Sequence, residues 1–158
     1  MKKIISLLLA CLLALCACAQ GEPIDSEYFS SFMAEKGFTV ENHTENLDQA
    51  LDFYRGEGEQ IKAWGSYFVC FDKYCDEEAA KKAITDYKNY YEAMLEIQEG
   101  ERFYAQKSYL QYKYTDSFES TQKLFIASQI DSTVITVYAR IEYTEAAEAL
   151  LKELGYGR

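Results

Sequence analysis

Histidine and basic residues are scarce in this sequence. The single histidine, His43, stands in a polar stretch between Glu41 and Glu45, where a lone histidine is usually a solvated side chain and not a metal ligand. Lysine and arginine together number 16 against 26 acidic residues, which gives a net charge of -10. Nucleic acid is bound by basic stripes, so this balance argues against a nucleic-acid partner and against electrostatic docking on anionic lipid headgroups. We therefore expect no metal, no cofactor and no nucleic acid.

Catalytic and cofactor motifs are also missing. The sequence contains no phosphate loop, dinucleotide fingerprint, calcium loop or zinc-ligand spacing. Ser66, within Trp64-Gly65-Ser66-Tyr67, lacks the second glycine of a hydrolase nucleophile elbow and falls within an expected strand. Carboxylates are plentiful, but the sequence pairs no two of them across a cleft. We predict a protein that is not an enzyme, with a carboxylate-based hydrolase as the remaining enzymatic alternative.

The first residues have the make-up of an export signal. Lys2 and Lys3 precede an apolar run over residues 4–15 that is too short to span a bilayer as a permanent helix. We assign residues 1–17 to a signal peptide. Residues 18–25 then form a short tether, which contains the only proline, Pro23, and spans at most ~25 Å when extended.

The segment Leu15-Cys16-Ala17-Cys18 resembles the bacterial lipobox, in which a small residue precedes the cysteine that receives the lipid. This resemblance implies that Cys18 is the lipid anchor and that the tether holds the domain close to the membrane. Cys16 is an imperfect match to the motif. Ala17-Cys18-Ala19 also fits ordinary cleavage after Ala19, which would give a secreted protein.

Periodicity predicts one α+β domain over residues 26–158. We expect helices over residues 26–36, 77–95 and 145–154, with Asp25 or Ser26, Asp76 and Thr144 as caps and Gly37 and Gly155 as stops. A short helix over residues 47–54 is optional. Strands are expected over residues 37–40, 61–71, 103–114, 122–128 and 133–143.

These elements predict a single antiparallel sheet of four to five strands with helices packed mainly on one face. The strand over residues 61–71 is apolar on both alternating faces, so we place it centrally, beneath the helix that follows it. The last two strands should form a hairpin through Asp131-Ser132. The final strand alternates apolar and polar residues, which is typical of a position at or near an edge.

Two cysteines lie within the expected domain. Cys70 and Cys75 are separated by four residues, whereas thioredoxin-like redox motifs have two, so catalysis is not expected. In an exported protein their spacing allows a structural disulfide across the intervening turn. Two unpaired small apolar residues fit the sequence equally well.

Tyrosine is unusually abundant, with 14 residues in the chain. Five of them fall in expected strands: Tyr104, Tyr109, Tyr112, Tyr114 and Tyr138. Tyrosine combines a large contact area with a polar tip, so these rings could form an aromatic platform for a glycan, a peptide or a partner protein. The alternative is structural, because strands favour tyrosine and exposed rings can cover an open sheet face.

Four segments carry a family resemblance: residues 25–40, 68–83, 127–134 and 150–156. With the lipobox, they are similar to small uncharacterised bacterial lipoproteins with the same order of elements. The resemblance implies a membrane anchor and a single domain, and it brings no activity or site residue. We expect an exported, membrane-anchored accessory or binding module. The alternative is an inhibitor or structural partner of another envelope protein, with acidity steering it toward a basic target.

Overall fold

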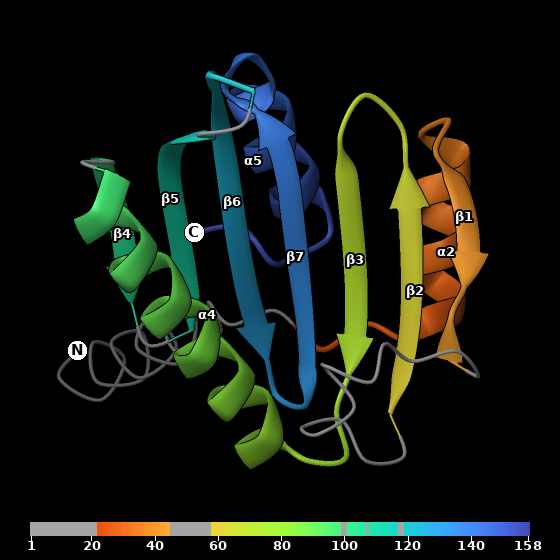
Figure 1. Ribbon diagram of the computed structural model, residues 1–158. Coiled ribbons are helices and arrows are strands. Elements are labelled where there is room, and N and C mark those ends of the chain that lie inside the picture. The colour runs from red at the N-terminus through yellow and green to blue at the C-terminus, as the bar shows by residue number, and fades with distance from the viewer. Residues whose placement is uncertain (1–21, 45–57, 99–100, 107, 117–118) are drawn as a thin grey trace, which may run out of the picture.

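The computed structural model describes residues 22–44, 58–98, 101–106, 108–116 and 119–158, with only the backbone path described for 95–98 and 101–106. These residues form a seven-stranded antiparallel sheet flanked by helices, which confirms the predicted α+β class (Figure 1). The elements are α2 (Ser26–Glu35), β1 (Thr39–Asn42), β2 (Glu59–Trp64), β3 (Phe68–Lys73), α4 (Glu77–Gln98), β4 (Glu101–Gln106), β5 (Tyr109–Asp116), β6 (Thr121–Ile130), β7 (Thr133–Arg140), the 3-10 turn η2 (Ile141–Tyr143) and α5 (Thr144–Glu153).

The prediction of four to five strands is too low because two predicted strands are hairpins. The stretch 61–71 divides at Gly65-Ser66-Tyr67 into the end of β2 and the start of β3, which pair antiparallel with Trp64 opposite Phe68. The stretch 103–114 likewise divides into β4 and β5. Apolar residues continue on both sides of each turn, so the pattern alone reads as one long strand.

The strand order is β1-β2-β3-β7-β6-β5-β4, which corrects the predicted place of the last strand. The β6–β7 hairpin is confirmed, and Asp131 adopts the left-handed φ of 51° in its turn. However, β7 is the central strand, and it pairs with β3 on its other side. Val134 and Thr136 on one face of β7 are buried as fully as Ile135 and Val137 on the other.

Helices lie on both faces of the sheet, and not mainly on one. Figure 1 shows α4 in front of the sheet and α2 and α5 behind it. Helix α4 contacts β5, β6 and β7. It therefore lies over the other half of the sheet from the β2–β3 hairpin, which immediately precedes it in the chain. Two apolar cores result, one between the sheet and α2 with α5, and one beneath α4. The cover by α4 explains why β7 is buried on both faces.

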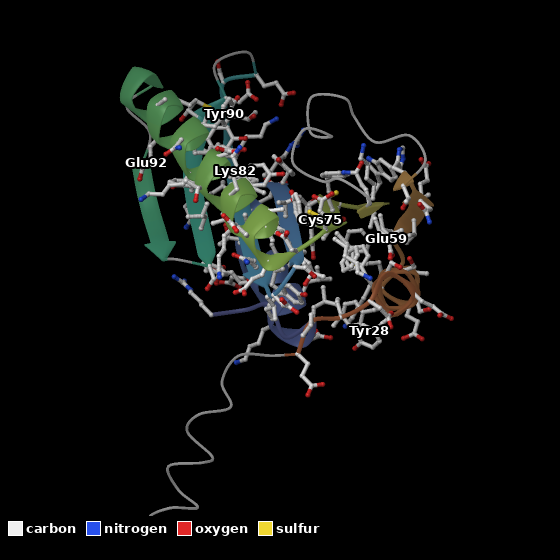
Figure 2. All side chains as sticks on the ribbon, turned by 90° about the horizontal axis from the view of Figure 1, so that it is seen from below. Tyr28, Glu59, Cys75, Lys82, Tyr90 and Glu92 are labelled. Carbon is white, nitrogen blue, oxygen red and sulfur yellow. The ribbon has the colours of Figure 1, made fainter. Side chains whose placement is uncertain are left out.

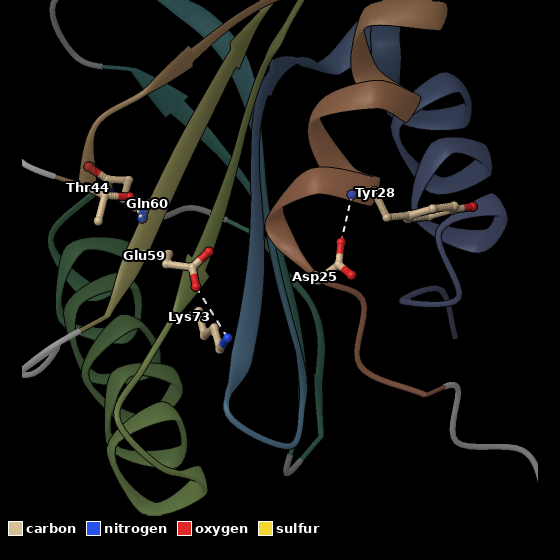
Figure 3. A network of polar contacts seen from close by, with 6 residues as sticks. All are labelled: Asp25, Tyr28, Thr44, Glu59, Gln60 and Lys73. Atoms are coloured by element: carbon tan, nitrogen blue, oxygen red, sulfur yellow. Dashed lines mark hydrogen bonds and ion pairs between the residues drawn. The ribbon is translucent and has the colours of Figure 1, made fainter.

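Local capping signals are mostly confirmed. The Asp25 carboxylate accepts a hydrogen bond from the Tyr28 N–H at 2.7 Å at the start of α2 (Figure 3). Asp76 does the same for the Ala79 N–H at 2.8 Å before α4. Gly37 and Gly155 take left-handed φ angles of 85° and 82° just after α2 and α5. Thr144 differs from expectation: it is the first residue of α5, and its hydroxyl donates to the Ile141 carbonyl.

Three predicted segments lie wholly or partly outside the described residues: the signal peptide over 1–17, the first half of the tether over 18–25 and the optional helix over 47–54. Within the described part of the chain, no helix combines the length and the apolar content needed to cross a bilayer.

Candidate binding surface

A row of aromatic side chains crosses the sheet on its α4 face. Strand register places these residues at directly opposed positions on five neighbouring strands: Trp64, Phe68, Tyr138, Phe125 and Tyr112. Directly opposed residues of antiparallel strands project to the same face and lie close together. We call these five residues the aromatic row.

Neighbouring rings of the row are in contact. Ring centroids are 5.6 Å apart for Trp64 and Phe68, 5.7 Å for Phe68 and Tyr138, and 4.9 Å for Tyr138 and Phe125. The planes of these pairs are tilted by 50°, 44° and 57°. Aromatic pairs at such distances contribute about 0.5–1.5 kcal/mol each beyond their buried area. The row is therefore a stable feature of the sheet.

One half of the row belongs to the core beneath α4. Phe125 and Tyr112 are fully buried, and Tyr91 of α4 stacks on both, with centroid distances of 4.2 Å and 5.3 Å. Tyr87 of α4 lies over Phe125 at 5.2 Å. Burial raises the pKa of the Tyr87 and Tyr91 hydroxyls far above the ordinary tyrosine value. This half of the row has a structural role.

The other half of the row reaches the surface. Trp64 is 37% exposed, and Phe68 and Tyr138 are half-buried. We call Trp64, Phe68 and Tyr138 the aromatic shelf. Burial is the main reason that the pKa of Tyr138 is raised, and the nearby Cys70 and Asp72 add to it. The shelf thus offers ring surface at Trp64 and keeps the Tyr138 hydroxyl protonated.

Charged side chains flank the shelf on both sides. Lys62 lies two residues before Trp64 on β2, and Arg140 lies two residues after Tyr138 on β7, so both project to the shelf face. Neither side chain makes a hydrogen bond or ion pair with a described residue. Lys123, opposite Arg140, also lies on this face and pairs with Asp116 at 3.4 Å and Glu119 at 2.9 Å.

The one histidine lies at the outer end of the shelf. The His43 ring is 5.7 Å from the Trp64 ring, and its Nε2 atom lies 3.1 Å from the Glu41 Oε2 atom. Among the described residues, no three histidine, cysteine or acidic side chains are grouped as metal ligands would be. His43 therefore belongs to the border of the aromatic surface.

Polar contacts at the opposite end of β2 hold the strands that carry the shelf. Figure 3 shows the Gln60 N–H donating to the Thr44 hydroxyl at 3.2 Å and Glu59 paired with Lys73 across the β2–β3 ladder at 3.3 Å. A hydrogen bond from Ser26, together with Lys73, lowers the pKa of Glu59. These contacts connect β1, β2, β3 and the start of α2.

The structure does not gather the predicted tyrosines on one exposed face. Tyr109 is buried in the core on the α5 side, whereas Tyr112 is buried under α4. Tyr114 is half-buried beside Tyr91, and the Tyr104 side chain lies outside the described residues. Only Tyr138 contributes to the shelf.

Sequence reasoning missed Trp64 and Phe68 as surface candidates. The signal that could have found them is Gly65-Ser66, a turn that brings Trp64 opposite Phe68 on the same face.

Cys70 and Cys75, the two cysteines of the predicted domain, lie in different environments. Cys70 is buried on β3, with its sulfur 3.5 Å from the Gln60 amide nitrogen and 3.6 Å from the Asp72 Oδ2 atom. Cys75 is exposed in the segment between β3 and α4 (Figure 2). No disulfide joins the two. The predicted anchor Cys18 lies outside the described residues.

The sequence matches no protein-family model and no curated protein. Function is therefore inferred from the surface and its chemistry.

Proposed function

We propose that this chain is an exported lipoprotein, anchored to the outer side of the bacterial cell membrane through Cys18, that binds a ligand on the aromatic shelf without catalysing a reaction. The observation that carries the proposal is the exposure of Trp64 at the outer end of the aromatic row. Tryptophan with an exposed face and a fixed neighbour is typical of recognition surfaces, because it offers a large rigid area at little entropic cost.

Anchoring is supported by the lipobox-like Leu15-Cys16-Ala17-Cys18 and by the apolar run before it. Mass spectrometry of the native protein should find a mature N-terminus at Cys18 that carries acyl chains. The Cys18→Ser variant should lose the acyl chains and leave the detergent phase on phase separation. A mature chain that begins after Ala19 without lipid would instead establish the secreted form.

Binding can be followed through Trp64, since it is the only tryptophan in the chain. We would titrate the mature protein in detergent with three probes: β-1,4-linked mannohexaose, its uronic acid counterpart, and an aromatic-rich hexapeptide. At least one probe should change the Trp64 emission in a saturable way. If none does, the proposed function is wrong.

Variants locate the site. Trp64→Ala should weaken binding of the active probe by about tenfold, measured by calorimetry, because a central aromatic contact is lost. Tyr28→Ala is the matched control, since Tyr28 is a half-exposed aromatic on α2, on the other side of the sheet. Equal weakening by both variants would place binding elsewhere.

A further inference from the structure

We propose that the ligand of the aromatic shelf is an oligosaccharide that carries carboxylate groups. This inference rests on the proposed binding function and names the ligand class for the same surface. It depends on three features of the shelf: its place on the sheet face, the spacing of its rings and the two cations that flank it.

The position of the shelf disfavours an extended peptide. Such peptides commonly bind by adding a strand to a sheet edge, where backbone groups supply the hydrogen bonds. The shelf residues instead lie on β2, β3 and β7, whose backbone groups are used in ladders on both sides. A ligand on this face must be recognised by side chains alone. Sugars suit this mode, because a pyranose ring has a flat face of C–H bonds and an edge of polar groups.

The ring spacing matches a sugar chain. Successive shelf rings are 5.6 Å and 5.7 Å apart along a line that crosses the strands. This spacing is close to the length that one pyranose and its glycosidic oxygen add to a β-1,4-linked chain. Successive rings are also tilted by 50° and 44°, which suits a chain that rotates from one sugar to the next. The repeat of the shelf thus matches that of the sugar chain, with Trp64 as its most exposed ring.

The charges beside the shelf select for carboxylate. Lys62 and Arg140 lie on opposite sides of the row, each about 7 Å along the strand from a shelf residue. Among the described residues neither side chain has a hydrogen-bond or ion-pair partner, and the acids of this face are engaged by other residues: Glu41 by His43, Asp72 by Gln60 and Asp116 by Lys123. Arginine binds carboxylate through paired hydrogen bonds, and lysine adds a point charge. In a chain of net charge -10, these two cations provide local attraction for an anionic ligand.

The test compares two probes that differ only in charge. Mannohexaose and the β-1,4-linked hexamer of mannuronic acid share their sugar configuration and linkage, and the second carries a carboxylate in place of each hydroxymethyl group. We expect the uronate to bind about tenfold tighter at low salt, measured by Trp64 emission and by calorimetry, since two charge-assisted contacts of about threefold each combine to about tenfold. High salt should reduce this difference.

Variants that remove a single positive charge test whether Lys62 and Arg140 bind the carboxylates. Lys62→Gln and Arg140→Gln should each weaken uronate binding about threefold or more and leave mannohexaose binding unchanged. The matched control is Lys152→Gln, an exposed lysine on α5 behind the sheet, which should change neither. Equal effects of Lys152→Gln and Arg140→Gln would overturn the inference, because charge would then act only over long range.

The outcomes separate this inference from the proposed function. If mannohexaose binds as tightly as the uronate, or if only the aromatic-rich peptide changes the Trp64 emission, the ligand class is wrong and the shelf remains a binding site. If no probe affects Trp64, both proposals fail.

Discussion

Gln60 and Asp72 face each other on β2 and β3 and share a buried hydrogen bond, with the Gln60 Nε2 atom 2.8 Å from the Asp72 Oδ1 atom. Both residues are 1% exposed. They lie at the far end of the same ladder that carries Trp64 and Phe68. Because a slip of one residue would turn one strand's side chains to the other face, this pair helps to keep Trp64 opposite Phe68.

Replacing Gln60 should therefore destabilise the fold. In the Gln60→Leu variant, the buried Asp72 carboxylate loses its amide donor, so we expect the free energy of unfolding to fall by about 1–3 kcal/mol. Urea unfolding would measure the loss. Gln122→Leu, on the exposed side of β6, is the control and should change the stability by less than about 0.5 kcal/mol. Similar effects at both positions would show that the buried pair is not important.

Gly65 has no side chain, and the Phe38 ring occupies the space that a side chain at this position would need. A Cβ atom at this position would lie 2.9 Å from the Phe38 ring, which packs edge-on against Tyr67. Gly65→Ala should displace Phe38 and lower stability by about 1–3 kcal/mol. Adding Phe38→Leu should recover part of the loss, since it makes room. Ser66→Ala in the same turn is the control, and a double-mutant cycle without coupling between Gly65 and Phe38 would contradict this explanation.

Local signals in the sequence predicted local structure well. Asp25 and Asp76 cap α2 and α4 because capping needs only a side-chain acceptor and a nearby N–H group. Strand order was not predictable in the same way. The pairing of β3 with β7 joins residues 68–73 to 133–138, and no local pattern reports such a distant partner. The central place of β7 and the cover by α4 both depend on that pairing.

The candidate surface was predicted only in part. Tyr138 was identified as an aromatic strand residue, but Tyr112 on the same row is covered by Tyr91 of α4, which strand periodicity cannot reveal. Trp64 and Phe68 read as one buried strand because apolar residues run through both sides of their turn. Aromatic composition indicated that a row of rings was available, and the packing of α4 determines which rings remain exposed.

The two domain cysteines should differ in reactivity. Cys75 is exposed, whereas Cys70 is 4% exposed within β3. Iodoacetamide should label Cys75 in the folded protein and Cys70 only after denaturation, because alkylation needs an accessible thiolate. Peptide mapping by mass spectrometry distinguishes the sites. A peptide pair lacking two hydrogens would show a disulfide and contradict the separation of the two thiols.

Tyr156 packs the segment after α5 against the core. The Tyr156 ring is 1% exposed, its hydroxyl hydrogen-bonds with Thr133, and its carbonyl accepts from the Ser128 hydroxyl at 2.7 Å. Tyr156→Ala should lower stability by about 3–5 kcal/mol, and Tyr156→Phe by about 1 kcal/mol because only the hydroxyl contact is lost. Thermal and urea unfolding would measure both. Arg158→Ala, at an exposed position, should have little effect; a similar loss there would contradict the role of the ring.

Stability should decline at alkaline pH because of the tyrosines around the aromatic row. Burial raises the pKa of Tyr87, Tyr91 and Tyr138 above the ordinary value of 10.0. Below about pH 10 these hydroxyls are protonated in both the folded and the unfolded chain, so they add no pH dependence. Above that value the unfolded chain releases protons that the folded chain retains. Unfolding is then favoured by up to about 1.4 kcal/mol per pH unit for each such tyrosine.

Urea unfolding between about pH 8 and about pH 11 would measure this decline, and tyrosinate absorbance would report ionisation directly. Tyr138→Phe keeps a ring on the shelf and removes one hydroxyl. The free energy of unfolding should therefore fall less steeply with pH, by the contribution of one released proton. Tyr28→Phe, which removes the hydroxyl of a half-exposed tyrosine on α2, is the matched control and should change the slope less than Tyr138→Phe does. Equal slopes for Tyr138→Phe and the parent protein would mean that Tyr138 ionises as readily in the folded chain as in the unfolded one. Burial beside Phe68 would then not oppose ionisation of the Tyr138 hydroxyl.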